Sequence, residues 1–371
     1  MTKARTNASA TPAVGRNMVI NGGMNISQRA VSATGIGANY GGYFTVDRWR
    51  IYAQSTAGRL TMTQTSDGPN GISANCIKLD CTTADASIAA GEILLLKQTF
   101  EGQNLQRIGS GVAGAKQITV SFYVKASAGF TFGCELDNHD NNRQCTKLFD
   151  TTTDWVRHEI TFPADVDDGS SPMDDDNAQS LSLNFWLHAG TTNTGGTLNT
   201  AAFANTTTAN RAAGIDSFFS NTANNFFLTG VQMEVGPVAT ELEQEDAGVT
   251  LAKCQRYYAH YAGASGATHK RFGNGKNATT TISDIIVALP CELRTTPTIV
   301  TTGTASDYST YHANTVTANS ALPSINTATD AGVGNLVGLD TTVGSGLTVG
   351  QGVQLMANNN VDTFLAFDAE L

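Results

Sequence analysis

Two loops of this sequence concentrate side chains that bind hard metal ions. The stretches DVDDGSSPMDDD (165–176) and DNHDNNR (137–143) are rich in carboxylates and amides, and calcium in proteins takes about six to eight oxygen ligands of this kind. The candidate ligands are Asp165, Asp167 and Asp168. Neither loop has EF-hand spacing, because the glycine of DVDDG comes one residue early. A calcium site and a solvated acidic turn between strands both stay open, and we expect no other cofactor.

Four ring-bearing side chains have the chemistry to contact a sugar. Tyr123, Trp155 and Trp186 fall opposite the main apolar faces of their strands, and His188 follows Trp186 on the same outward face. Exposed aromatic rings on a β-sandwich mark interaction surfaces, and such rings can stack on sugars while nearby amides and carboxylates bind the hydroxyls. The alternative is that a loop or a neighbouring chain covers these faces.

Catalytic motifs are absent from the sequence. It contains no GxSxG and no HExxH, and no Ser/His/Asp arrangement can be proposed from local spacing. His158 falls on the inward face of a strand, where we expect a packed, hydrogen-bonded imidazole. The glycine-rich stretches GIGANYGG (35–42) and FGNGKN (272–277) have the wrong spacing to hold a phosphate and are predicted to be turns. We therefore expect no enzyme.

Composition excludes further classes. The chain has 371 residues and a net charge of −10, which disfavours binding to nucleic acid or an anionic membrane through a general electrostatic field. No apolar run approaches the ~20 residues that span a bilayer, so no membrane insertion is expected. Residues 1–16 are basic, small and proline-containing, which is typical of a flexible arm. The six cysteines have no zinc-type spacing and are predicted to be mostly free, buried thiols.

Alternation of apolar and polar residues with a period of two predicts strands through residues 17–240. In ITVSFYVKAS (118–127), Ile118, Val120, Phe122 and Val124 share one face. Similar patterns occupy GRLTMTQT, CIKLDC, EILLLKQTFEG, WVRHEITF and LSLNFWLHAG. Seven or eight antiparallel strands close most economically as a jelly-roll-type β-sandwich, so the fold class is all-β.

The strand in FFLTGVQMEVGPVAT (226–240) stops at Gly236-Pro237, and the acidic run ELEQED follows. Next, Leu251, Cys254, Tyr258 and Tyr261 form a helical stripe, which predicts a short linker helix within 241–263. Residues 264–371 are predicted to form a second, smaller β-sandwich, with strands in ISDIIVALP, PTIVTT, GVQLMA and TFLAFDAEL. The polar interval 301–350 indicates long loops, or strands that find a core only against a partner chain.

Several long motifs together resemble one family. NMVINGGMNISQRA (17–30), YFTVDRWRIY (43–52), FFLTGVQMEVGPVATELEQED (226–246), CQRYYAHY (254–261) and the closing FDAEL resemble bacteriophage tail fibre and related virion structural proteins with a carbohydrate-binding-like β-sandwich. The similarity extends well over about residues 17–261 and loosely beyond. The chain departs from the family pattern at Pro237-Val238, where a Ser-rich turn is expected, and at 241–243, where Pro-Phe-Glu is more usual.

The motif residues are interpreted as architecture. Asp47, Arg48 and Trp49 are predicted to form a buried ion pair beside an aromatic ring. Asn21-Gly22-Gly23 is predicted to form a turn. Gln232 and Glu234 lie on the outward face of the last strand, where they can contact a neighbour or the linker. Gln255, Arg256 and Tyr257 belong to the helix motif.

The resemblance implies a non-enzymatic virion protein that is usually a homotrimer. It implies an N-terminal arm bound to other virion proteins of the tail or capsid, and a distal part that recognises host cell-surface polysaccharide by weak contacts multiplied by symmetry. A tail fibre subunit, made in the bacterial host cytoplasm, is the expected function. The alternative is a capsid decoration or head-fibre protein, and a glycan depolymerase is a third possibility.

Overall fold

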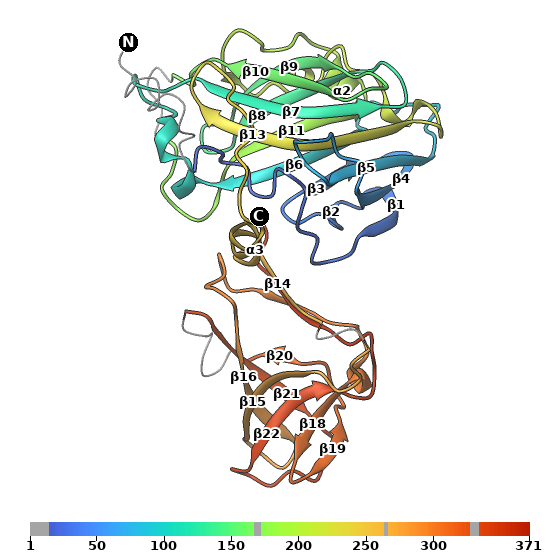
Figure 1. The fold of residues 1–371 in the computed structure, drawn as a ribbon, viewed down its shortest axis with the longest axis vertical. Coiled ribbons are helices and arrows are strands. Elements are labelled where there is room, and N and C mark those ends of the chain that lie inside the picture. The colour runs from blue at the N-terminus through green and yellow to red at the C-terminus, as the bar shows by residue number, and fades with distance from the viewer. Residues whose placement is uncertain (1–14, 167–171, 263–265, 327–333) are drawn as a thin grey trace. The chain divides into compact units, whose positions relative to one another are not determined.

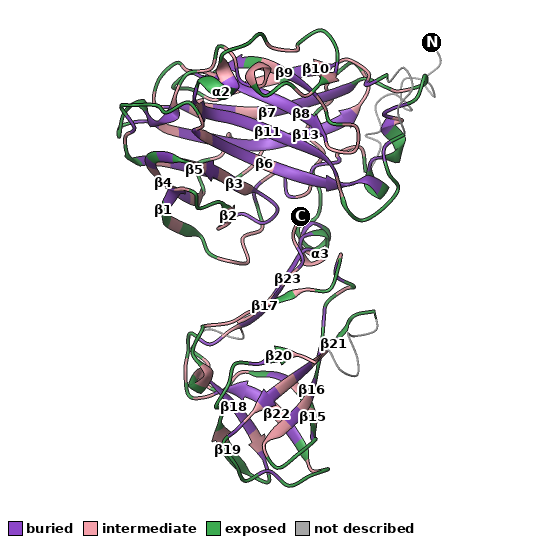
Figure 2. Ribbon diagram, turned by 180° about the vertical axis from the view of Figure 1, so that it is seen from behind, coloured by how far each residue is buried: buried purple, intermediate pink, exposed green. Residues whose placement is uncertain are grey.

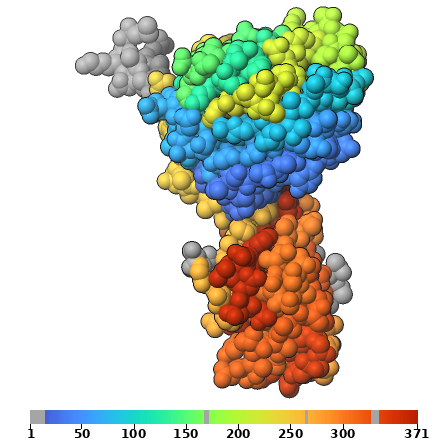
Figure 3. Space-filling model, turned by 90° about the vertical axis from the view of Figure 1, so that its right-hand side faces the viewer, coloured from blue at the N-terminus to red at the C-terminus, as the bar shows by residue number. Residues whose placement is uncertain are grey.

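The computed structural model describes residues 15–166, 172–262, 266–326 and 334–371, and strands dominate these ranges. The described residues fall into two compact units. One contains the residues up to Thr250 together with Leu371, and the other contains Leu251–Glu370. The division lies inside the linker predicted at 241–263. In Figure 3, segments from blue to yellow make up the visible surface of the first unit, whereas the second unit shows gold, orange and red segments.

The first unit contains two antiparallel sheets, which Figure 1 shows as stacked layers. The six-stranded sheet has the order β1 (Ser32–Ala38), β4 (Thr56–Thr65), β5 (Cys76–Thr83), β13 (Asn225–Val235), β7 (Ile118–Ala126), β10 (Val156–Phe162). The seven-stranded sheet has the order β12 (Ala204–Asn205), β9 (Arg143–Asp150), β8 (Thr131–Asn138), β11 (Gln179–Ala189), β6 (Ile93–Glu101), β3 (Arg50–Gln54), β2 (Gly42–Tyr43). The predicted all-β sandwich is confirmed.

The core of this unit lies between the two sheets. Val120, Phe122 and Val124 of β7 are fully buried there, as their alternation predicts. Phe122 meets Phe185 of β11 edge to face, with the ring centroids 5.0 Å apart. Each such buried side chain contributes about 1.5–3 kcal/mol. Figure 2 shows most of the length of these strands as buried. His158 packs on Phe122 and hydrogen-bonds the Asp150 carbonyl through Nε2, as expected.

Short helices connect the strands. They are η1 (Gly102–Asn104), η2 (Gln106–Ile108), α2 (Thr191–Thr194), η3 (Thr208–Asn210), η4 (Phe218–Ser220) and η5 (Ala305–Asp307). None of the helices in the described ranges is long and apolar enough to cross a membrane. All six cysteines are free thiols, and only Cys291 is partly exposed.

The last strand of the first unit ends where the sequence predicts. β13 stops at Val235, and the Gly236 amide donates to the Gln117 carbonyl, 2.9 Å away, as the chain leaves the sheet. The buried Gln232 and Glu234 side chains hold the segment that follows. Glu234 Oε1 accepts from the Thr240 amide at 2.8 Å, and Gln232 Oε1 accepts from the Glu243 amide at 2.8 Å. Gln232 and Glu234 therefore contact the linker, which is one of the two alternatives expected for them; the other was a neighbouring molecule.

The linker helix is shorter than predicted. α3 covers Ala247–Gln255, and Asp246 caps it by accepting from the Gly248 amide. The Tyr257 amide then donates to the Cys254 carbonyl, and β14 (Tyr258–Tyr261) begins directly after. Placing Tyr258 and Tyr261 on a helical stripe is therefore wrong. Pairing of β14 with β23 (Leu365–Asp368) satisfies the backbone that a longer helix would have used.

The second unit also packs two antiparallel sheets on one core. The three-stranded sheet has the order β14, β23, β17 (Thr298–Val300). The seven-stranded sheet has the order β19 (Thr315–Ala318), β18 (Tyr308–His312), β22 (Gly352–Ala357), β15 (Arg271–Asn277), β16 (Ile282–Ala288), β21 (Leu336–Thr342), β20 (Ser324–Ile325). Leu365 and Phe367 from the first sheet share the core with Ile285, Leu339 and Leu355 from the second.

Two expectations about this part of the chain are wrong. The described residues of 301–350 are not only long loops, and their strands pair within the chain: Tyr308 of β18 and Leu339 of β21 are fully buried. The buried polar side chains of these strands are satisfied by hydrogen bonds to one another. For example, Thr310 Oγ1 donates to Asn319 Oδ1 at 2.9 Å.

The glycine-rich stretch 272–277 forms part of β15 and is not a turn. A Cβ at Gly275 would lie 1.8 Å from the Asp284 carbonyl, so the glycines allow close approach of neighbouring strands. The ends of the stretch 35–42 belong to β1 and β2, and the predicted turn lies between them, where the Tyr40 amide donates to the Gly37 carbonyl at 2.9 Å.

Candidate functional site

The outer face of the seven-stranded sheet in the first unit is closed. Trp186 of β11 points to this face but is fully buried. His188 is also fully buried, but a β-bulge separates it from Trp186 and its ring packs on Phe219 of the core between the sheets. Ala212 and Ile215, from the connection between α2 and η4, pack with the Trp186 indole. The expected exposure of Trp186 is therefore wrong because a loop covers it, and that of His188 is wrong because its ring packs on Phe219 in the core. Sequence parity identifies the face of a side chain but not what lies on it.

Beneath this cover lies a charged network centred on Glu135 of β8. Its fully buried carboxylate accepts from Arg211 Nε at 2.8 Å, from Trp186 Nε1 at 2.8 Å and from Asn184 Nδ2 at 2.8 Å. The guanidinium carbon of Arg211 lies 5.3 Å from the Trp186 ring centroid, and the group also pairs with Asp137. Burial acts to lower the pKa of Arg211, but the two carboxylates outweigh it and raise that pKa. The network closes this face and leaves Trp186 no free ring surface.

The candidate calcium ligand Asp165 serves a buried ion pair. Its Oδ1 accepts from Arg143 Nε at 2.8 Å. Its Oδ2 accepts from Ser110 Oγ and Asn138 Nδ2, each at 2.8 Å. Asp167 and Asp168 lie outside the described residues, so the calcium site stays a prediction that rests on them.

The outer face of the six-stranded sheet carries the two remaining predicted ligands. Tyr123 lies in β7, Trp155 directly precedes β10, and both rings are half-buried. Phe227 of β13 stands opposite Lys125 of β7 in the register, and the Trp155 and Phe227 centroids are 6.2 Å apart. The strands thus gather aromatic rings that are far apart in sequence.

Lysines lie between these rings. Lys125 Nζ is 5.2 Å from the Trp155 centroid and 4.6 Å from the Phe227 centroid. Lys78 of β5 stands opposite Phe227 in the β5–β13 register, and its Nζ is 5.6 Å from the Phe227 centroid. Cation–π contacts of this kind contribute about 0.5–1 kcal/mol each at exposed sites. We call Trp155, Lys125, Phe227 and Lys78 the aromatic–lysine row.

A loop with polar groups borders the row. Lys125 Nζ pairs with Asp67 Oδ2 at 2.7 Å, and Trp155 Nε1 donates to the Asp67 carbonyl at 3.2 Å. These contacts fix the indole plane while the Asp67 side chain stays 55% exposed. Sequence parity could have found Lys125, since it lies two residues after Tyr123 on the same strand. No local signal links Asp67 or Phe227 to Trp155.

The motif residues near the N-terminus are structural. Asp47, Arg48 and Trp49 are all fully buried, and the Asp47 carboxylate pairs with Arg29 at 4.0 Å. Burial raises the pKa of Asp47 in spite of the hydrogen bonds from Gln28. The Asn21 turn is confirmed by the bond from the Met24 amide to the Asn21 carbonyl, and Trp49 Nε1 also donates to that carbonyl.

The motif of Gln255, Arg256 and Tyr257, at the end of α3 and directly after it, bonds to other segments of the second unit. The Arg294 amide donates to the Arg256 carbonyl at 2.9 Å, and the Ala369 amide donates to the Tyr257 carbonyl at 2.8 Å. Tyr257 is fully buried, and Gln255 is the last residue of α3. These contacts fit the architectural role expected of Gln255, Arg256 and Tyr257.

The second unit also has a surface hollow of about 500 Å³. Asp284 of β16 and Asp340 of β21 stand directly opposite each other at its wall. Burial raises the pKa of Asp340, and the charge of Asp284 raises it further. The hollow lacks an aromatic ring among its described lining residues, so a sugar would find no stacking surface there.

Comparisons with known proteins give distant structural similarity only. No family model matches the chain, and no curated protein matches it. Among solved structures, the enzymatically active domain of bacteriophage CBA120 tailspike protein 4 aligns with a TM-score of 0.30 at 11% identity, over 59% of this chain and 21% of that one.

Two further solved structures were aligned over similar shares of the chain. TmCBM61 in complex with beta-1,4-galactotriose aligns with a TM-score of 0.29 at 11% identity, over 60% of this chain and 99% of that one. The family 11 carbohydrate-binding module of Clostridium thermocellum in complex with a beta-1,3-1,4-mixed-linked tetrasaccharide gives 0.27 and 14%, over 57% and 99%. Because these TM-scores are low, the function is argued from the side chains of this chain and not from the structural neighbours.

Proposed function

We propose that this chain is a non-enzymatic glycan-binding subunit of a bacteriophage fibre, and that the aromatic–lysine row with Tyr123 is its sugar-binding surface. The observation that carries the proposal is the pair of half-buried rings, Trp155 and Tyr123, on the open outer face of the six-stranded sheet. A flat ring held at the surface offers a sugar an apolar face without first having to be ordered.

The polar neighbours of the rings suit a polyhydroxylated ligand. Asp67 accepts hydrogen bonds, and its carboxylate is more than half exposed. Lys78 is 33% exposed and donates. Each contact of this kind is weak because water competes for the same groups. Single-site affinity is therefore expected to be low, and tight attachment would depend on several copies acting together.

The virion part of the proposal is supported by the sequence resemblance. A homotrimeric fibre, bound to other virion proteins through residues 1–16, would present three copies of the row to host polysaccharide. Light scattering of the purified chain tests the trimer: a particle of three times 38.9 kDa is expected, and a monomer at micromolar concentration would contradict it. Labelling on intact particles tests the location, since a signal on the capsid shell favours the head-fibre alternative.

The binding site is tested with the full chain on an array of bacterial surface polysaccharides. Trp155→Ala is expected to weaken binding to the best ligand about tenfold or more, because the largest stacking surface is removed. Tyr40→Ala is the matched control, since Tyr40 is 60% exposed in the same unit but lies outside the row. Equal loss in both variants, or no loss in Trp155→Ala while the fold is intact, would overturn the assignment.

Catalysis is tested on the same ligand. Incubation with the protein is expected to leave the chain length of the polysaccharide unchanged, measured by size-exclusion chromatography. Shortened product would replace the binding proposal with a depolymerase.

A further inference from the structure

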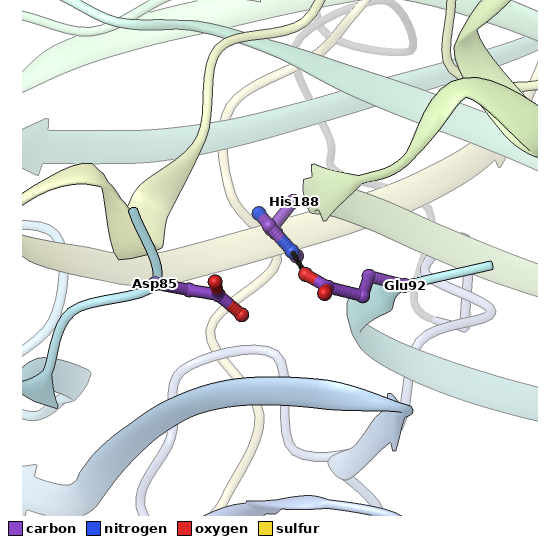
Figure 4. Close-up of side chains that lie close together, drawn as sticks. All are labelled: Asp85, Glu92 and His188. Atoms are coloured by element: carbon purple, nitrogen blue, oxygen red, sulfur yellow. Dashed lines mark hydrogen bonds and ion pairs between the residues drawn. The ribbon is translucent and has the colours of Figure 1, made fainter. Parts of the chain in front are cut away.

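Three buried metal-ligating side chains meet at one end of the first sandwich. Asp85 lies in the loop that follows β5, Glu92 directly precedes β6, and His188 is the penultimate residue of β11. Figure 4 shows the three side chains converging from these separate segments. Their exposed fractions are 4%, 3% and 0%. One ligand atom from each lies within 4.8 Å of the other two.

Hydrogen bonds direct the three side chains toward one another. Asp85 Oδ2 accepts from the Ala57 amide at 2.8 Å and from Thr56 Oγ1 at 3.0 Å. Glu92 Oε1 accepts from the Ala89 amide at 2.8 Å, which leaves Oε2 toward His188. His188 Nε2 lies 2.9 Å from that Oε2.

The second imidazole nitrogen is also held in place. His188 Nδ1 lies 2.8 Å from Ser217 Oγ, and the ring packs edge to face on Phe219. Phe219 is linked to the same cluster, since the Asp85 amide donates to its carbonyl at 2.8 Å. The imidazole is thus preorganised with Nε2 directed at the carboxylates.

The cluster carries unbalanced negative charge. Among the described residues, neither Asp85 nor Glu92 forms an ion pair with a lysine or arginine. Arg59 is bonded near Thr56, but its Nη1 donates to the carbonyls of residues 56, 57 and 58. Two carboxylates buried without a basic partner cost several kcal/mol unless a cation or a proton neutralises them.

We propose that Asp85, Glu92 and His188 form a binding site for one divalent cation of the zinc class. His188 Nε2 and one oxygen of each carboxylate would be the three protein ligands, and a water molecule would complete a tetrahedron. Ligand atoms around tetrahedral zinc lie ~3.3 Å apart, so rotation of the two carboxylates from their present positions brings the set together.

The donor set selects against calcium and magnesium. Calcium takes about six to eight oxygen ligands, and magnesium needs about six in an octahedron. Here the other Asp85 and Glu92 oxygens already accept backbone amides, from Ser87 at 3.2 Å and from Ala89. A buried site with a nitrogen donor and few ligands suits zinc better than either ion.

Cation binding would move the imidazole proton of His188 from Nε2 to Nδ1. Without a metal, an ionised Glu92 can only accept, so Nε2–H would donate to it and Nδ1 would accept from Ser217 Oγ. With a metal on Nε2, the proton must lie on Nδ1 and donate to Ser217 Oγ, as metal-bound imidazoles usually donate through their second nitrogen. The hydroxyl of Ser217 can take either role, so no buried group loses its hydrogen bond.

The site would fasten the two sheets together. Asp85 and Glu92 bracket the loop that carries the chain from β5 in the six-stranded sheet to β6 in the seven-stranded sheet. His188 belongs to the seven-stranded sheet, and Asp85 is bonded to Thr56 and Ala57 of β4 in the other. One cation there would neutralise the cluster and hold the crossover loop between the layers.

The test uses the full chain, stripped with a chelator and titrated with Zn²⁺, Ca²⁺ and Mg²⁺ separately. One equivalent of Zn²⁺ is expected to bind, with X-ray absorption showing a first shell of one nitrogen and oxygens and no sulfur. The midpoint of thermal unfolding is expected to rise about 5 °C or more at a hundredfold excess over Kd. The other two ions are expected to give no such shift.

Variants locate the site. His188→Gln and Glu92→Gln are each expected to weaken Zn²⁺ binding at least a hundredfold. His158→Gln is the matched control, because His158 also packs on an aromatic ring and bonds a backbone carbonyl but has no carboxylate cluster. In nitrogen NMR of labelled histidine, Zn²⁺ is expected to move the proton from Nε2 to Nδ1 of one imidazole.

Three results would overturn the proposal. They are no Zn²⁺ binding by the folded chain, stoichiometric binding that His188→Gln leaves unchanged, and a stabilising response to Ca²⁺ alone. If both cluster variants fail to fold, the absorption spectrum and the NMR of the unaltered chain still decide the question. A shell without nitrogen, or an unchanged tautomer, would exclude His188 as a ligand.

Discussion

The ammonium group of Lys125 lies 4.6 Å from the centroid of the Phe227 ring, and the two residues stand directly opposite each other in the β7–β13 register. The same ammonium group lies 5.2 Å from the Trp155 centroid, and the two ring centroids are 6.2 Å apart. Lys125 therefore lies beside both rings and contacts each of them. These contacts connect the Trp155 indole, which precedes β10, to β7 and β13 of the six-stranded sheet.

Lys125→Met is expected to lower the free energy of unfolding of the first unit by about 1–2 kcal/mol. Methionine keeps the apolar stem but removes two cation–π contacts and the ion pair with Asp67. All three tryptophans lie in this unit, so their fluorescence in urea reports its unfolding. The difference from the unaltered protein is expected to shrink in 1 M salt, where charges at the surface are screened. An identical difference at both salt concentrations would contradict a charge-based role.

Gly230→Ala is expected to destabilise the first unit by about 1–2 kcal/mol and to weaken glycan binding. Gly230 has φ +60°, and a Cβ there would lie 2.9 Å from Cδ2 of Tyr123. The strained backbone lowers stability, and the displaced Tyr123 ring alters the proposed binding surface. Gly114→Ala is the control, since nothing lies within 4 Å of its Cβ. The control is expected to change unfolding free energy by less than about 0.5 kcal/mol. Unchanged glycan binding in Gly230→Ala would separate Tyr123 from the site.

Arg211→Met is expected to lower the free energy of unfolding of the first unit by about 3–5 kcal/mol, because it leaves the buried Glu135 carboxylate without its cation. Glu135→Gln in the same chain is expected to restore part of this loss, since the charge that needs pairing is then gone. Urea unfolding of the single and double variants gives the coupling energy directly.

The control for Arg211 is another arginine–glutamate pair. Arg157 pairs with Glu159, and their side chains are 28% and 49% exposed. Arg157→Met is therefore expected to lower the free energy of unfolding by less than about 1 kcal/mol. A similar cost for both arginines would falsify the view that the Glu135 network closes its face of the sheet.

Local patterns in the sequence predicted the strands well. In β7 and β10 the alternation gives the correct buried face, because Val120 and Ile160 repeat with the period of a pleated strand. Gly236 and Pro237 correctly mark the end of β13. The same reasoning failed for Tyr258 and Tyr261, since a stripe of four residues cannot distinguish a continued helix from a helix followed by a strand.

The sites depended on contacts that no local pattern encodes. Ala212 and Ile215 pack on Trp186, and no pattern near Trp186 in the sequence predicts this contact. Asp85 and Glu92 lie at the two ends of the β5–β6 connection, and only the closed sandwich brings them to His188 near the end of β11. Polar strands such as β18 were missed because hydrogen bonds between side chains, as at Thr310, replace the apolar alternation that strand prediction relies on.

His139 is expected to make the first unit less stable as the pH falls from about 6.5 to about 4. Its Nε2 bonds Ser182 Oγ at 2.9 Å beneath the covered face. Burial lowers the pKa of His139 to about 4, and the charges of Lys97 and Arg211 add to this, against smaller opposing effects of Glu135 and Asp140. In the unfolded chain the pKa is ~6.5.

The sign follows from the two pKa values of His139. Between pH 6.5 and pH 4 the unfolded chain binds the proton and the folded chain does not, so falling pH favours unfolding. Carboxyl groups also titrate at the lower end, and the comparison is therefore between the unaltered protein and His139→Gln. The variant is expected to show a flatter decline of the urea midpoint over this window, while His269→Gln, an exposed histidine of the second unit, leaves the curve unchanged. Parallel curves for all three proteins would mean that His139 is already protonated in the folded state, and that the charged network beneath the cover accepts one more positive charge.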